Sequence, residues 1–150
     1  MFRVICLVIG YFLGCIQTAY FVGRFSKVDL SKKGSGNLGT TNTVRVLGLK
    51  KGLITFFCDV FKSAAAFYIC YFIFKENAVV AGFYGSAGAI IGHDFPFFHK
   101  FKGGKGIAVS AAVIVASSSN TSLGWIMIGV FLAVFIIVVG ITRYVSLGSL

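Results

Sequence analysis

The chain has 150 residues, of which 57% are apolar and only four are acidic, and its formal net charge is +10. Its mean hydropathy of +0.92 lies outside the range of soluble globular domains. The composition therefore excludes an ordinary soluble enzyme and indicates a protein of the membrane.

Apolar segments of roughly membrane-spanning length follow one another along the chain. We expect five transmembrane helices, which are Val4–Val22, Leu53–Phe74, Ala78–Ile91, Ile107–Ser119 and Leu123–Ile141, and the start of a sixth at Val145. The third and fourth are short, so they are expected to tilt, to extend into their flanks or to lie sheltered among neighbours. The sequence thus predicts an all-α polytopic membrane protein with a single integral membrane domain over residues 1–150.

The basic residues lie in alternate connections between these helices. The connection after the first helix contains Arg24, Lys27, Lys32, Lys33, Arg45, Lys50 and Lys51, the connection after the third contains Lys100, Lys102 and Lys105, and Arg143 follows the fifth. The other connections are nearly neutral. By the positive-inside rule the basic loops are cytoplasmic and the N-terminus is outside. The charge is therefore assigned to membrane topology, with the bilayer as a partner, and no nucleic-acid partner is expected.

The first basic loop, about Gly23 to Lys51, contains an ordered run of glycines, amides and hydroxyls at Gly34–Gly48. Glycines permit unusual backbone angles and the close approach of a ligand. If residues 40–47 are helical, Asn42 and Arg45 share one face, and arginine presents a planar fork that matches two phosphate oxygens. We therefore expect a ligand-binding loop here.

The second basic loop, Gly92–Gly106, contains the only proline, both histidines, three lysines and four glycines. Lysines interleaved with glycines offer bare backbone N–H groups beside positive charge, which suits a phosphate. A helix is expected to begin at Ile107, and its partial positive end would face the same ligand. The frame of a nucleotide P-loop is missing, so ATP is not expected.

Acid–base groups are sparse. His93 is followed directly by Asp94, so the histidine-x4-aspartate dyad of acyl-CoA-dependent acyltransferases is missing, and His93 is either structural or part of the site. Asp59 and Lys62, three residues apart, are expected either to form a structural ion pair or to contribute to the site. Two phosphate-binding loops on one membrane face indicate two phosphorylated substrates, or one with two phosphates. The small number of acid–base groups suits a substrate that is already activated, because its leaving group departs easily.

The two loops resemble the motifs of the bacterial acyl-phosphate:glycerol-3-phosphate acyltransferases of the PlsY type. The matching residues are Gly34–Asn37, Asn42, Arg45 and Gly48 in the first loop, Gly92, His93, Pro96 and Phe101–Gly106 in the second, and Phe57–Lys62 and Arg143–Leu147 elsewhere. The resemblance covers nearly the whole chain. Leu38 and Thr40 depart from the usual pattern, in which smaller or different apolar residues occur.

The resemblance implies transfer of a fatty acyl group from acyl phosphate to the 1-hydroxyl of glycerol 3-phosphate, which gives lysophosphatidic acid at the first step of phospholipid synthesis. It implies no cofactor and no metal. The implied catalytic residues are Ser35, His93 and Lys105, and the implied substrate-binding residues are Gly36, Asn37, Gly39, Asn42, Arg45, Lys102, Gly103, Gly104 and Gly106. Among them, Ser35, Arg45 and Lys105 would hold the glycerol phosphate, and the glycines of the second loop would help cradle the acyl phosphate.

The resemblance also implies a multi-pass protein of the bacterial cytoplasmic (inner) membrane, with its site loops on the cytoplasmic face and functional coupling to the enzyme that makes acyl phosphate. Members of the family extend further and carry a third polar motif, so we expect the chain to be the N-terminal part of a longer protein. The alternative function is a transporter or a binding subunit for a phosphorylated solute or anionic lipid. A phosphatidyl-alcohol synthase is disfavoured because the aspartate clusters that hold its metal are missing.

Overall fold

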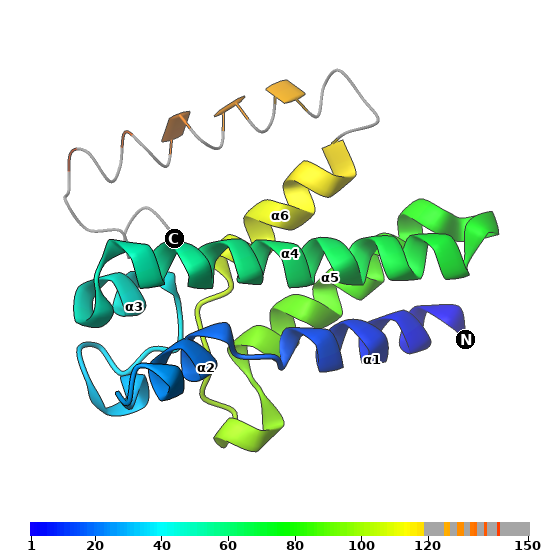
Figure 1. Cartoon of the computed structure of the whole chain (residues 1–150). Coiled ribbons are helices and arrows are strands. Elements are labelled where there is room, and N and C mark those ends of the chain that lie inside the picture. Colours follow the sequence, from blue (N-terminus) through cyan, green and yellow to red (C-terminus); the bar gives the residue numbers. More distant parts are fainter. Residues whose placement is uncertain (119–124, 127–128, 131–132, 135–136, 138–140, 142–150) are drawn as a thin grey trace. The chain divides into compact units, whose positions relative to one another are not determined.

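The computed structural model describes residues 1–118, 125–126, 129–130, 133–134, 137 and 141 (Figure 1). The described elements are helical, as the sequence predicts: α1 (Phe2–Gly14), α2 (Thr18–Phe25), η1 (Leu30–Lys32), α3 (Thr40–Leu47), α4 (Leu49–Ile73), η2 (Lys75–Asn77), α5 (Ala78–Asp94), η3 (Phe97–His99) and α6 (Ile107–Ser118). The chain divides into two compact units, 1–113 and 114–150. The loops and the helices that position them belong to the first unit, and the single domain stays a prediction.

The first apolar segment is not one continuous helix, which corrects the prediction of an unbroken span over Val4–Val22. α1 ends at Gly14, and α2 begins at Thr18 after a break at residues 15–17. The break is held by other parts of the chain: the Ile16 carbonyl oxygen accepts a hydrogen bond from Lys62, and the Gln17 side chain donates one to the His93 carbonyl oxygen. These long-range contacts stabilise a helix break that the local sequence pattern does not indicate.

The next three predicted helices occur with small differences in length. α4 begins four residues earlier than predicted. α5 continues past its predicted end at Ile91 to Asp94, and α6 begins at Ile107 as predicted. Among the described residues, only Phe2–Phe25 and Leu49–Ile73 satisfy both the length and the hydropathy expected of a complete span. The Leu123–Ile141 helix, the start of a sixth at Val145 and the Arg143–Leu147 motif fall wholly or largely outside the described residues.

Glycines allow α1 and α5 to pack with their backbones almost in contact. In Figure 1, α5 lies against both α1 and α4, and its contact with α1 is the more extensive. A Cβ atom added at Gly10 would overlap the Gly85 carbonyl oxygen, and one added at Gly92 would overlap the Tyr11 carbonyl oxygen. Such small-residue faces are typical of helix pairs in membranes, where close packing drives association.

Many bulky apolar side chains lie on the outside of the first unit, whereas most of its buried residues are small or polar. The side chains of Phe57, Phe61 and Phe72 are 64%, 74% and 63% exposed, whereas the charged Asp59 is 1% exposed. This is the reverse of the distribution in a soluble protein, because water would penalise such an apolar surface. The distribution fits helices whose outer faces contact lipid and whose polar groups face one another.

Candidate functional site

Asn42 holds the backbone of the first loop. Its side chain is 2% exposed. The Asn42 Oδ1 accepts a hydrogen bond from the Ser35 N–H at 2.8 Å, and its Nδ2 donates to the carbonyl oxygens of Leu30 and Lys33, both at 3.1 Å. Both amide protons are therefore used inside the loop. This arrangement gives Asn42 a structural role, and the substrate contact implied for it stays a prediction.

Two glycines give this loop its sharp turns. Gly34 and Gly36 have φ angles of 64° and 73°, in the left-handed region that disfavours side chains. A Cβ atom at Gly34 would also overlap the Asn42 Oδ1. Ser35 lies between the two glycines with its side chain exposed, so its hydroxyl is accessible while its N–H is fixed by Asn42.

Asp29 stabilises the start of the same loop. Its carboxylate accepts hydrogen bonds from the Ser31 N–H at 3.0 Å and the Ser31 hydroxyl at 2.6 Å, and the Lys32 Nζ lies 3.6 Å away. The Ser31 hydroxyl hydrogen bond holds the pKa of the Asp29 carboxyl below its ordinary value. Asp29 is therefore ionised near neutral pH and engages Lys32.

α3 extends over Thr40–Leu47, so the helix on which the shared face of Asn42 and Arg45 depended is present. Its start is fixed by the Thr43 hydroxyl, which donates to the Gly39 carbonyl oxygen at 3.0 Å. Arg45 is exposed, one turn after the buried Asn42. Asn37 is half-buried next to Gly39, where a Cβ atom would come within 3.1 Å of the Asn37 Oδ1.

The second loop folds back onto the end of α5. The Gly103 N–H donates to the Asp94 carbonyl oxygen, and the Gly104 N–H donates to the His93 carbonyl oxygen, both at 3.0 Å. These two N–H groups are not bare, which corrects that part of the sequence interpretation. What the glycines supply here is the lack of a side chain: a Cβ atom at Gly103 would overlap the His93 carbonyl oxygen, and one at Gly104 would overlap the His93 ring.

The two loops meet through a backbone hydrogen bond. The Leu38 N–H donates to the Gly103 carbonyl oxygen at 3.3 Å. The Leu38 side chain is 2% exposed and packs with Ala19 and Leu30 in a small apolar cluster beneath the first loop. Leu38 is thus accommodated despite its departure from the family pattern, and its N–H joins the first motif to the second.

Three of the predicted site cations lie on the surface near these loops. Arg45, Lys102 and Lys105 are exposed, and within the described part of the chain none of them has an ion pair or a side-chain hydrogen bond. Lys102 directly precedes Gly103, and Lys105 precedes Gly106, whose φ of 63° leads into α6. Lys102 and Lys105 therefore precede the start of α6, and cations near a helix N-terminus favour the binding of an anion.

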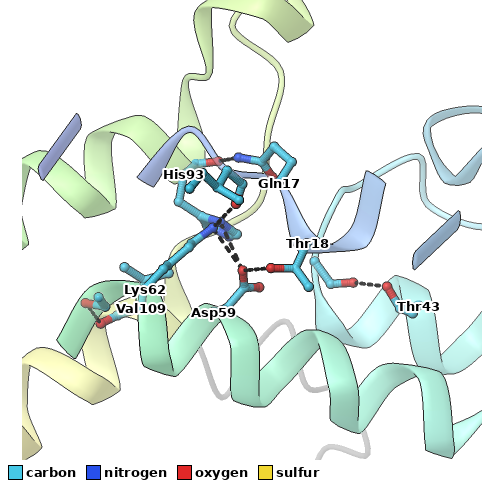
Figure 2. A network of polar contacts seen from close by, with 10 residues as sticks. Gln17, Thr18, Thr43, Asp59, Lys62, His93 and Val109 are labelled. Atoms are coloured by element: carbon cyan, nitrogen blue, oxygen red, sulfur yellow. Dashed lines mark hydrogen bonds and ion pairs between the residues drawn. The ribbon is translucent and has the colours of Figure 1, made fainter. Parts of the chain in front are cut away.

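A buried polar network lies next to the second loop (Figure 2). The Lys62 Nζ lies 2.9 Å from the Asp59 Oδ1, 2.7 Å from the Ile16 carbonyl oxygen and 2.9 Å from the His93 Nδ1. The ion pair predicted for Asp59 and Lys62 is therefore confirmed. Figure 2 also shows the Thr18 hydroxyl bonded to the Asp59 Oδ1, at 3.1 Å.

Two members of this network were not predicted as site residues. The Gln17 Nε2 donates to the His93 carbonyl oxygen at 2.8 Å, and Thr18 supports Asp59. Their position in the sequence could have indicated a role, since two adjacent polar residues inside an apolar segment are costly in lipid unless they have partners. The partners themselves lie more than forty residues away in the sequence.

The predicted residues fall into two groups. One group lies in the contact between the loops or beneath it, and it contains Ser35, Asn42, His93, Gly103 and Gly104. The other group consists of exposed or half-buried residues with no described side-chain bond to the first group, and it contains Gly36, Asn37, Gly39, Arg45, Lys102 and Lys105. Gly106 is buried, and a Cβ atom there would lie 3.0 Å from the Asp94 Oδ1. Their joint action on a ligand stays a prediction.

Comparison with known proteins gives a consistent result. A family model described as glycerol-3-phosphate acyltransferase matches residues 4–150. A glycerol-3-phosphate acyltransferase of Thermoanaerobacter pseudethanolicus is 39% identical, over all of this chain and 72% of its own length. One of Clostridioides difficile is 40% identical, over 97% of this chain and 71% of its own length.

Two crystal structures are also similar. Both are of PlsY (YgiH), described as an integral membrane glycerol 3-phosphate acyltransferase. The glycerol 3-phosphate form has a TM-score of 0.80 and 34% identity, over 98% of this chain and 70% of that chain. The lysophosphatidic acid form has a TM-score of 0.79 and 33% identity, over 98% of this chain and 69% of that chain.

Proposed function

Because the chain belongs to the glycerol-3-phosphate acyltransferase family, we propose that it transfers a fatty acyl group from an acyl phosphate to the 1-hydroxyl of glycerol 3-phosphate. The products are lysophosphatidic acid and inorganic phosphate. The observation that carries this function in the structure is the hydrogen bond that joins the two loops at Leu38 and Gly103, together with exposed cations in both loops that have no ion pair among the described residues.

The first loop and its helix bind the glycerol 3-phosphate. The accessible Ser35 hydroxyl donates to a phosphate oxygen, and Arg45 and Lys105 balance the phosphate charge. Asn37, Gly36 and Gly39 line the approach with small or amide groups. Asn42 acts indirectly in this scheme, because its amide already holds the loop that presents Ser35.

The second loop binds the acyl phosphate. Lys102 neutralises charge there, and the free N–H groups at the start of α6, after Gly106, donate to the phosphate. Gly103 and Gly104 keep the loop surface free of side chains while their own N–H groups fix its path. The acyl chain extends from this loop toward the apolar faces of the helices.

The chemistry needs little beyond positioning and charge stabilisation. The hydroxyl oxygen of glycerol 3-phosphate attacks the acyl carbonyl carbon, and the bond from that carbon to the phosphate oxygen breaks. The electron pair leaves with the phosphate. A phosphate oxygen of the donor takes the hydroxyl proton, because the first-loop motif offers no carboxylate or imidazole for that task.

The bacterial cytoplasmic membrane is the proposed location, with both loops on the cytoplasmic face. The alternation of basic and neutral connections supports this orientation, and the bulky apolar outer faces of α1 and α4 support contact with lipid. An acyl phosphate is short-lived in water, so delivery from the enzyme that makes it is part of the proposal.

The test uses the purified chain in phosphatidylcholine vesicles with labelled glycerol 3-phosphate. We expect labelled lysophosphatidic acid with acyl phosphate and none with acyl-CoA. A variant in which residues 102–106 are shuffled at constant charge is expected to lose the activity, because a shaped loop is destroyed while the charge is kept. Transfer from acyl-CoA would contradict the donor assignment. Label that enters the vesicles without an acyl donor would favour a transporter.

A further inference from the structure

The hydrogen-bonding capacity of Lys62 is completely used by three acceptors. Its ammonium group has three N–H donors and no acceptor. The Asp59 Oδ1, the Ile16 carbonyl oxygen and the His93 Nδ1 lie 2.9, 2.7 and 2.9 Å from its Nζ. Since an ammonium can only donate, the His93 Nδ1 must be the unprotonated nitrogen of the ring.

The proton of the neutral His93 ring therefore lies on Nε2. This nitrogen is beside Gly104, at the place where any side chain on that residue would overlap the ring. His93 is 3% exposed, and its Nε2 has no hydrogen-bond partner among the described residues. An N–H that has no acceptor among the described residues and lies beside a glycine is suited to an acceptor oxygen brought by a ligand.

We propose that Lys62 is a positioning residue that fixes His93 as the Nε2–H tautomer, so that His93 donates a hydrogen bond to an anionic oxygen of the substrate beside Gly104. This role rests on the proposed function for the identity of that substrate. It makes His93 a donor and excludes it as a general base, because Nε2 already carries a proton and Nδ1 is occupied by the Lys62 ammonium. Asp59 completes the device by balancing the buried charge of Lys62.

The path of the loop depends on the same histidine. The His93 carbonyl oxygen accepts from the Gly104 N–H at 3.0 Å. It also accepts from the Gln17 Nε2 at 2.8 Å (Figure 2). Two groups of His93 thus lie against Gly104. The carbonyl oxygen accepts from the Gly104 N–H, and the ring occupies the place that a Gly104 side chain would take. A rotation of the His93 ring would therefore remove the donor from the loop surface.

The first measurement is the tautomer itself, from long-range ¹H–¹⁵N correlation spectra of the chain with ¹⁵N-labelled histidine in detergent micelles. A His99→Gln variant assigns the two histidines. We expect a protonated Nε2 and an unprotonated Nδ1 at His93, and a shift of the Nε2 signal when glycerol 3-phosphate or inorganic phosphate is added. A proton on Nδ1, or an Nε2 signal that neither anion moves, would overturn the inference.

The second measurement compares matched variants. The double variant Asp59→Asn, Lys62→Met removes both buried charges and keeps an acceptor for Thr18, whereas Lys75→Met removes an exposed lysine far along the chain. We expect mixed tautomers in the double variant and a fall in kcat/KM of about tenfold to a hundredfold, since a charge-assisted contact is lost. An Nε2–H tautomer that persists in a folded double variant would overturn the role of Lys62.

The two proposals fail separately. The wild-type tautomer and its response to phosphate are measured without any acyl transfer, so they decide the inference even if the double variant does not fold. Absence of acyl transfer together with the expected tautomer and phosphate response would contradict the proposed reaction and support the anion contact. Acyl transfer together with a proton on the His93 Nδ1 would support the proposed reaction and contradict the anion contact.

Discussion

The Leu38 N–H donates to the carbonyl oxygen of Gly103 across 3.3 Å, and this bond joins two motifs that lie sixty-five residues apart in the chain. Each motif also has its own internal support. Asn42 holds the first loop by three hydrogen bonds, and the end of α5 holds the second by two. The candidate site therefore consists of two loops, each held in shape by its own hydrogen bonds and joined to the other by the bond between Leu38 and Gly103.

Replacement of Asn42 by alanine is expected to lower the free energy of unfolding by about 2–4 kcal/mol, since three hydrogen bonds are lost and buried partners are left unpaired. The measurement is a denaturant titration in mixed micelles, with limited proteolysis of residues 26–39. Asn37→Ala is the matched control, because Asn37 is half-buried and its side chain has no described hydrogen bond. Equal stability of the two variants would contradict the structural role of Asn42.

Replacement of Arg45 by alanine is expected to raise the KM for glycerol 3-phosphate by about tenfold to a hundredfold, because a charge-assisted contact with the phosphate is lost. Arg24→Ala removes the same charge from another exposed position, in α2 ahead of the Gly34–Gly48 motif, and is expected to leave the KM nearly unchanged. The measurement is the initial rate of acyl transfer against substrate concentration. An unchanged KM in Arg45→Ala would remove Arg45 from the site.

Replacement of Gly92 by alanine is expected to destabilise the protein by about 1–3 kcal/mol, because the added methyl group would overlap the Tyr11 carbonyl oxygen and push α1 from α5. Thermal unfolding in detergent micelles provides the measurement. Gly129→Ala serves as the control, since nothing lies within 4 Å of the Cβ position there. If both variants unfold at the wild-type temperature, the close contact between α1 and α5 is not needed for stability.

Replacement of Ser31 by alanine is expected to raise the pKa of Asp29 toward its ordinary value, because the hydroxyl that stabilises the carboxylate is removed. In the folded wild type this pKa is lowered. The associated stability is therefore present above the unfolded-state pKa and is lost as the pH falls through the folded-state pKa. The measurement is an NMR titration of the Asp29 carboxyl carbon, with Lys32→Ala expected to give a smaller rise. A pKa unaffected by Ser31→Ala would assign the shift to another group.

Local patterns predicted much of the architecture. Residues 40–47 form a helix between two glycines, and α6 begins where the glycines and lysines of the second loop end. The break at residues 15–17 was not predictable, because its polar groups are satisfied by Lys62 and His93 from later helices. The inward direction of Asn42 was equally hidden, since the spacing of Asn42 and Arg45 shows that they are near one another and not which of them is buried.

The three acceptors of Lys62 have a consequence for the synthesis of the protein. Asp59 and Ile16 are made before Lys62, but His93 follows it by thirty-one residues. In a nascent chain that has reached only α4, the Lys62 ammonium therefore lacks one of the three acceptors that it has in the folded protein, although α4 must enter the bilayer. Insertion of α5 supplies the missing imidazole and, in the same event, the histidine carbonyl oxygen that later receives the second loop. The insertion of α5 thus completes the hydrogen bonding of Lys62 and provides the carbonyl oxygen against which the second loop folds.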